Sequence, residues 1–138
     1  MSPSSPDQGL PQAGFDGLVA VVDDDLSVRR ALERLFASVG VRCNAHESGL
    51  GFLESPALHE ADCLLLDLHL PGMSGAEVLA EVQVAASKLP VILMTGRYEV
   101  DFAEKALSAG ASAFLRKPFG EEELFAALRE ATGRSVDS

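Results

Sequence analysis

Short apolar runs and longer amphipathic stretches alternate along most of the chain. The apolar runs predict five strands: Leu18–Val22, Val41–Ala45, Cys63–Leu66, Val91–Met94 and Ala113–Leu115. Several are almost continuously apolar, which is typical of strands whose two sheet faces are both covered by helices. Strands that alternate with helical stretches indicate repeated strand–helix units, and therefore an α/β fold with a parallel sheet.

The helical stretches carry apolar residues at intervals of three to four positions. Such a stripe runs from Val28 to Val39, and Gly40 provides a stop signal after it. Further helices are predicted over Ala76–Ala86, Glu99–Ala109 and Glu121–Ala131, with a shorter one over Ser48–Glu54. The pattern thus predicts five helices. Three acidic residues open the last of them, where the helix dipole favours negative charge.

The two ends of the chain lack this periodicity. Residues 1–16 contain three prolines, and we expect them to form a flexible leader. A globular domain is expected over residues 17–132, followed by a flexible tail over 133–138. A chain of 138 residues is the usual size for one compact core.

Composition narrows the classes of partner. The net charge is -10 and no run of Lys or Arg is present, so direct binding to nucleic acid is not expected. The apolar stretches are too short to span a membrane, and the N-terminus lacks a secretory signal, so a cytoplasmic protein is expected. Cys43 and Cys63 show no CxxC spacing, which favours reduced thiols in the core.

Three consecutive carboxylates follow the first predicted strand, at Asp23, Asp24 and Asp25. Adjacent like charges repel one another, so such a group requires either a cation or exposure to water. One interpretation is an acidic turn in which Asp25 or Ser27 caps the next helix. The other is a cation site.

A further carboxylate, Asp67, ends the third predicted strand. In an open parallel sheet, ligands bind outside the carboxyl ends of the strands near the switch in strand order, so both acidic segments are expected to converge there. Carboxylates, a main-chain carbonyl and water suit a hard cation such as Mg²⁺, with Mn²⁺ as an alternative. No His/Cys cluster indicates zinc.

Two more strand ends carry complementary groups, Thr95-Gly96 and Lys117-Pro118. A hydroxyl and an ammonium group stabilise charge on phosphoryl oxygens, and a carboxylate can accept the phosphorus atom. Taken singly, Thr95 could be an ordinary buried strand residue and Lys117 a surface residue. Together with the two acidic strand ends, however, they place reactive groups at four strand ends, and this combination favours phosphoryl chemistry.

The segments VAVVDDDLSVRRALERLF, CLLLDLHLPGMSG, LPVILMTG and AGASAFLRKPF carry a resemblance to a known family. The sequence resembles the receiver domains of two-component response regulators, most closely the FixJ-type subclass, over about Leu18 to Leu128. The resemblance implies a flavodoxin-like, doubly wound five-stranded sheet in the order 2-1-3-4-5. In that order Cys43 and Cys63 lie on opposite sides of the first strand, roughly 9.5 Å apart and beyond disulfide reach.

The resemblance also implies a role for each site residue. Asp67 matches the phosphoacceptor, and Asp23, Asp24, Asp67 and the backbone carbonyl of His69 match the metal ligands. Thr95 and Lys117 match the groups that bind the phosphoryl oxygens, while Gly96 leaves room for access. Pro118 matches a proline whose preceding peptide bond is commonly cis.

Three other positions allow two interpretations each. Phe114 matches a switch aromatic, here without a phenolic hydroxyl, but an apolar aromatic on a strand can equally be ordinary core. His69 and Arg97 flank the site and could tune the lifetime of the phosphoryl group, or be exposed residues without a role.

As a receiver, the domain is expected to take its phosphoryl group from a sensor histidine kinase or phosphotransfer protein. It would then change its binding of a target protein, or associate weakly with itself, through the face made by the Glu99–Ala109 helix, the Ala113–Leu115 strand and the Glu121–Ala131 helix. It would act alone or as the input domain of a transcriptional regulator, and not as an enzyme beyond its own phosphorylation and dephosphorylation.

Two alternatives remain from the residues themselves. A small Mg²⁺-dependent aspartyl phosphatase would need a second acid two residues after the nucleophile, where this chain has His69. A pseudo-receiver that serves only as a scaffold would lack site residues, and none of them is missing here.

Overall fold

The structure, a computed structural model, describes residues 17–96 and 101–133. Its centre is a five-stranded parallel sheet in the order β2-β1-β3-β4-β5. The strands are β1 (Leu18–Val22), β2 (Arg42–His46), β3 (Cys63–Asp67), β4 (Val91–Thr95) and β5 (Ala113–Arg116). The chain therefore has the doubly wound α/β fold that the sequence predicted.

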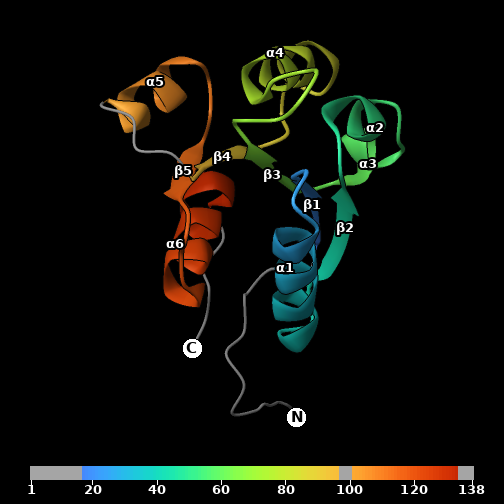
Figure 1. Ribbon diagram of the computed structural model, residues 1–138, viewed down its shortest axis with the longest axis vertical. Coiled ribbons are helices and arrows are strands. Elements are labelled where there is room, and N and C mark those ends of the chain that lie inside the picture. Colours follow the sequence, from blue (N-terminus) through green and yellow to red (C-terminus); the bar gives the residue numbers. More distant parts are fainter. Residues whose placement is uncertain (1–16, 97–100, 134–138) are drawn as a thin grey trace.

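Helices cover both faces of this sheet (Figure 1). They are α1 (Leu26–Ser38), α2 (Gly49–Leu53), α3 (Ala57–Glu60), α4 (Gly75–Ala85), α5 (Phe102–Ser108) and α6 (Glu121–Thr132). Helices α1 and α6 lie on one face, and α2 to α5 on the other. Within the described residues, no helix has both the length and the apolarity needed to cross a membrane.

The described residues form one more helix than the five predicted. The addition is α3, which has only 4 residues and follows Pro56. A single turn carries no repeating apolar stripe, so periodicity could not reveal it. Helix α5 begins at Phe102 instead of Glu99, and residues 99 and 100 fall outside the described part of the chain. The predicted leader, 1–16, and residues 134–138 of the predicted tail also fall outside it.

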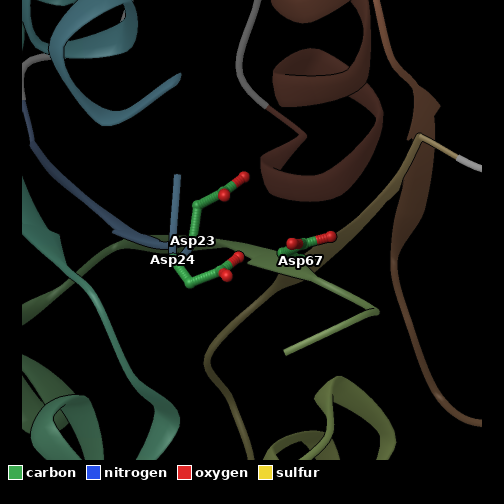
Figure 2. Close-up of side chains that lie close together, drawn as sticks. All are labelled: Asp23, Asp24 and Asp67. Carbon is green, nitrogen blue, oxygen red and sulfur yellow. The ribbon is translucent and has the colours of Figure 1, made fainter. Parts of the chain in front are cut away.

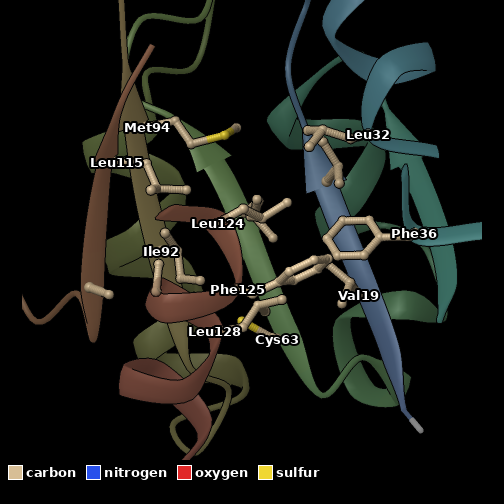
Figure 3. Close-up of a cluster of buried hydrophobic side chains, with 14 of the residues drawn as sticks. Val19, Leu32, Phe36, Cys63, Ile92, Met94, Leu115, Leu124, Phe125 and Leu128 are labelled. Carbon is tan, nitrogen blue, oxygen red and sulfur yellow. The ribbon is translucent and has the colours of Figure 1, made fainter. Parts of the chain in front are cut away.

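Two apolar layers hold the helices against the sheet. In β1, Val19 and Val21 face α1 and α6, while Ala20 and Val22 face the opposite helices, as the alternation of strand side chains requires. Figure 3 shows the first layer, in which Phe36 of α1 and Leu124 of α6 meet the sheet. Burying an aliphatic or Phe side chain contributes about 1.5–3 kcal/mol, so these layers fix the strand ends that carry the polar residues.

The cysteines lie on both sides of the first strand, as expected. Cys43 and Cys63 each pair with Val19 from opposite directions, and both are free thiols. Burial raises the pKa of each thiol to about 12. Cys63 is buried in the core, and Cys43 is partly buried against the same apolar layer.

Candidate functional site

Three carboxylates meet at the carboxyl ends of β1 and β3, which are neighbours in the sheet. Asp23 and Asp24 follow β1 and Asp67 ends β3, and Figure 2 shows the three side chains close together at these strand ends. One carboxylate oxygen from each lies within 4.8 Å of the others. Asp23 and Asp67 are buried and Asp24 is exposed, so the group opens to solvent on the side of Asp24.

Asp23 is held at both its main chain and its side chain. Its N–H donates to the carbonyl of His46 at 3.1 Å. One carboxylate oxygen accepts from the N–H of Asp25 at 2.9 Å, and the other lies 2.6 Å from Nζ of Lys117. Asp25, in turn, caps α1 by accepting from the N–H of Ser27 at 2.8 Å. Of the two capping residues considered from the sequence, Asp25 is therefore the one used.

The surroundings of Asp67 act on its pKa in opposite directions. Burial and the neighbouring Asp23 carboxylate raise the pKa of Asp67, while Lys117 acts in the lowering direction. The Lys117 ammonium lies 3.6 Å from Oδ2 of Asp67, and the N–H of His69 donates to Oδ1 at 3.3 Å. One ammonium group thus serves two buried carboxylates, which leaves excess negative charge at the site.

The loop between β3 and α4 is shaped by glycine. A Cβ atom at Gly75 would lie 2.5 Å from the carbonyl oxygen of Asp67, so the helix can start this close to Asp67 only with glycine there. Ser74 and Glu77 form a capping box that fixes the first turn of α4. The local sequence therefore determines where the main chain of Asp67 lies.

Thr95 and Lys117 bring the hydroxyl and the ammonium to the same edge of the sheet. Thr95 ends β4 and is fully buried, and its carbonyl accepts from the N–H of Lys117 at 2.7 Å. The bond between Lys117 and Pro118 is cis, as the resemblance implies. Among the described residues, a Cβ atom at Gly96 would meet only the Lys117 side chain, at 3.9 Å and beyond.

The remaining predicted residues differ in how closely they approach the carboxylates. Phe114 of β5 is half-buried and packs against the apolar layer beneath α4 and α5. His69 reaches Asp67 through its main-chain N–H. Arg97 lies outside the described residues. His46 lies outside this group: its ring packs edge-on against that of Phe52, with 5.5 Å between the ring centroids, and burial lowers its pKa.

Sequence reasoning missed Arg29. Its guanidinium, largely buried, donates to the main-chain carbonyl of Asp23 at 2.8 Å and lies 4.0 Å from the exposed carboxylate of Glu47. An arginine in an amphipathic helix is usually part of the solvated face. Its place directly after Val28, on the flank of the apolar stripe, was the one available signal that it could turn towards the strand ends.

The donor set fits a hard divalent cation. Three carboxylates supply oxygen ligands, which Mg²⁺ and Mn²⁺ prefer, and the group contains no thiol or imidazole of the kind that selects zinc. A cation would also offset the charge that Lys117 leaves uncompensated. The described residues thus provide an acidic pocket suited to binding a metal.

Comparison with known proteins agrees with this arrangement. The family model of the response regulator receiver domain matches residues 19–129. FixJ, a transcriptional regulatory protein of Azorhizobium caulinodans, is 38% identical over 119 residues, which cover 86% of this chain and 56% of FixJ. Nodulation protein W of Bradyrhizobium diazoefficiens is 38% identical over 126 residues, or 91% of this chain and 56% of that protein. The chain therefore spans about half the length of these relatives.

A solved structure supports the same grouping. The response regulator receiver protein from Burkholderia phymatum is 38% identical and has a TM-score of 0.76, and the match covers 88% of this chain and 98% of the other. The family model includes all three strand ends that carry Asp23, Asp67 and Thr95. This chain belongs to the family of response regulator receiver domains, which are signalling domains.

Proposed function

We propose that this domain accepts a phosphoryl group on Asp67 and loses it again by hydrolysis, and that the modification changes which partners it binds. The observation that carries the proposal is the position of Lys117. Its ammonium lies 2.6 Å from Asp23 and 3.6 Å from Asp67, within reach of oxygens that a phosphoryl group on Asp67 would bring. A scaffold would have no need of a buried, partly uncompensated charge cluster.

The transfer uses the Asp67 carboxylate as nucleophile. An oxygen of Asp67 forms the new O–P bond while the N–P bond of a phosphohistidine donor breaks, and the imidazole leaves. Attack of water on phosphorus later breaks the O–P bond and releases phosphate. Lys117 and the hydroxyl of Thr95 are suited to bind the phosphoryl oxygens, and Gly96 leaves space beside Lys117 for them.

Asp23, Asp24, Asp67 and the carbonyl of His69 are the proposed ligands of Mg²⁺, with Mn²⁺ as a substitute. When bound, the cation supplies positive charge for the phosphoryl oxygens. The chain's own groups keep the ligands in place: Asp25 and Lys117 hold the Asp23 carboxylate, and the N–H of His69 holds that of Asp67.

Readout is proposed on the face made by α5, β5 and α6. Thr95 and Phe114 connect the site to this face, because Thr95 precedes α5 and Phe114 lies in β5, where it is half-buried. Moving a two-state element from mostly inactive to mostly active requires about 5.5 kcal/mol of preference for the active state. A charge-assisted contact to Lys117 and a hydrogen bond to Thr95 together approach this size.

The proposed donor is a sensor histidine kinase or a phosphotransfer protein, in the cytoplasm. FixJ is described as a transcriptional regulator, and this chain matches about half of it. By analogy, the domain would act as the input of such a regulator or on its own. Neither nucleic acid nor membrane is a proposed direct partner.

Intact-mass measurement tests the acceptor. Incubation with acetyl phosphate and Mg²⁺ should add the mass of one phosphoryl group to the wild type, and chelation of the metal should suppress the gain. Asp67→Asn should show none, whereas Asp62→Asn should still be labelled, because Asp62 lies at the opposite end of β3 and accepts from Leu18. Undiminished labelling of Asp67→Asn would refute the assignment.

Sedimentation tests the readout face. The exposed part of α5 is mostly polar, and Leu107, 49% exposed, is its one large apolar side chain outside the undescribed side chain of Phe102. Such a surface favours weak association. With beryllofluoride and Mg²⁺ we expect weak self-association that Asp67→Asn abolishes and Lys117→Ala reduces. A tight dimer without activator would contradict this.

A further inference from the structure

Arg29 is the charged residue near the carboxylates whose contact none of the proposed chemistry uses. It lies in the first turns of α1, and its side chain is only 14% exposed. The guanidinium donates to the main-chain carbonyl of Asp23 at 2.8 Å. The only carboxylate near it in the described contacts is that of Glu47, at 4.0 Å and itself 80% exposed, which is too open to water to hold it strongly.

The carbonyl that Arg29 binds belongs to the peptide that joins Asp23 to Asp24. Fixing this oxygen fixes the plane of that peptide and thereby the direction in which the Asp24 side chain leaves the main chain. Asp24 is exposed, and within the described residues no hydrogen bond holds its carboxylate. Its position therefore depends on its main chain.

Other hydrogen bonds hold the main chain on either side of the Asp23–Asp24 peptide. The N–H of Asp23 is bound to His46, and the N–H of Asp25 is bound to the Asp23 carboxylate. Arg29 itself continues the same helix turn, since its N–H donates to the carbonyl of Asp25 at 3.1 Å. The main chain from Asp23 to Asp25 is therefore held at the N–H and carbonyl of Asp23 and at the N–H of Asp25.

We infer that Arg29 is a positioning residue for the cation site, which aims Asp24 by holding the carbonyl of Asp23. This inference rests on the proposed function, because it assumes that Asp23 and Asp24 bind Mg²⁺. Partners that orient ligands without touching the metal commonly change metal affinity by about 10–100-fold when they are removed.

Simple electrostatics makes the opposite prediction. Arg29 brings positive charge towards three carboxylates, so removing that charge should strengthen the binding of a cation. Positioning predicts weaker binding. The direction of the change in Mg²⁺ affinity therefore separates the two roles.

The experiment is isothermal titration calorimetry with Mg²⁺ on four chains: wild type, Arg29→Met, Arg29→Lys and Arg30→Met. Arg30 is the matched control, because it carries the same charge on the next residue of α1 but is exposed. We expect Arg29→Met to raise the Kd about tenfold, and Arg30→Met to change it by less than about twofold. Arg29→Lys keeps the charge without the planar fork, so it should also bind more weakly than the wild type.

A Kd for Arg29→Met at or below that of the wild type would overturn the inference. If that variant does not fold by circular dichroism, Arg29→Lys decides, and an unchanged Kd would then overturn it. Kinetics with acetyl phosphate add a second readout: the Mg²⁺ concentration at half-maximal rate should rise far more than the maximal rate falls. Failure of the wild type itself to bind Mg²⁺ would instead refute the proposed function.

Discussion

Asp67 is placed where its charge is disfavoured. It is buried beside Asp23, and both the burial and the Asp23 carboxylate raise its pKa above the ordinary 3.8. Lys117 offsets this only in part, because its ammonium lies closer to Asp23 than to Asp67. A charged Asp67 therefore stabilises the folded domain less than an uncharged side chain at this position would. Such a cost to stability is common where function requires several like charges close together.

Replacing Asp67 by Asn should therefore stabilise the metal-free domain at neutral pH. Because the folded chain holds the proton to a higher pH than the unfolded chain, stability falls as pH rises through the ordinary pKa and on to the raised one. Asp67→Asn escapes this loss, so its Tm should exceed that of the wild type at pH 7. The gain should shrink towards about pH 4 and disappear below it.

Thermal melts over this pH range in the presence of a chelator provide the measurement. Glu81→Gln is a suitable control, since Glu81 is an exposed carboxylate on α4. Its Tm should follow that of the wild type at every pH. A Tm of Asp67→Asn below that of the wild type at pH 7 would contradict the account of the site.

The first residue of α4 packs against the main chain of Asp67 and so helps to fix the position of the acceptor. Gly75 meets the main chain of Asp67 and Leu68, so the added methyl group of Gly75→Ala should push the helix or the strand end aside. We expect a loss of about 1–3 kcal/mol in the free energy of unfolding. Phosphorylation of Asp67 should slow as well, because the acceptor would be displaced.

Gly96→Ala is the contrasting variant. Within the part of the chain that the structure describes, its new Cβ would contact only the Lys117 side chain, at ordinary van der Waals distance. Its free energy of unfolding should stay within about 0.5 kcal/mol of the wild type, while acceptance of the phosphoryl group slows. Urea unfolding with acetyl phosphate labelling measures both. Equal stability of Gly75→Ala and wild type would show that the close contact is not a constraint.

The strands and long helices could be predicted because their patterns arise from burial. β3 is apolar until Asp67 and has helices on both faces, and α1 carries one clear apolar stripe. The convergence of the strand ends followed from the rule for parallel sheets. The single-turn helix α3 and the partner of Arg29 could not be predicted, since neither a four-residue turn nor a side chain bound to a main-chain carbonyl leaves a periodic signal.

Charge on the whole molecule favours cation binding at this edge of the sheet. The chain has a net charge of -10, and three of its carboxylates share the site. A cation that binds only the folded state adds RT ln(1 + [L]/Kd), or about 1.4 kcal/mol at tenfold saturation. We therefore expect Mg²⁺ to raise the Tm, and an equal ionic strength of NaCl to raise it less.

Asp24→Ala should separate the repulsion among the carboxylates from the stabilisation by Mg²⁺. Removing one of the crowded carboxylates should raise the Tm of the metal-free protein and reduce the further gain from Mg²⁺. Differential scanning calorimetry with chelator and with millimolar Mg²⁺ gives both values. An unchanged wild-type Tm on adding Mg²⁺ would argue against a cation site in this pocket.

The central claim concerns the atom that carries the phosphoryl group. After the wild type is phosphorylated with acetyl phosphate and Mg²⁺, borohydride reduces the acyl phosphate to an alcohol, which converts the modified aspartate to homoserine and releases phosphate. Peptide mapping by mass spectrometry should then find homoserine at position 67 alone, and only in samples that contained Mg²⁺. Homoserine at Asp23 or Asp24, or labelling that is independent of Mg²⁺, would contradict the account.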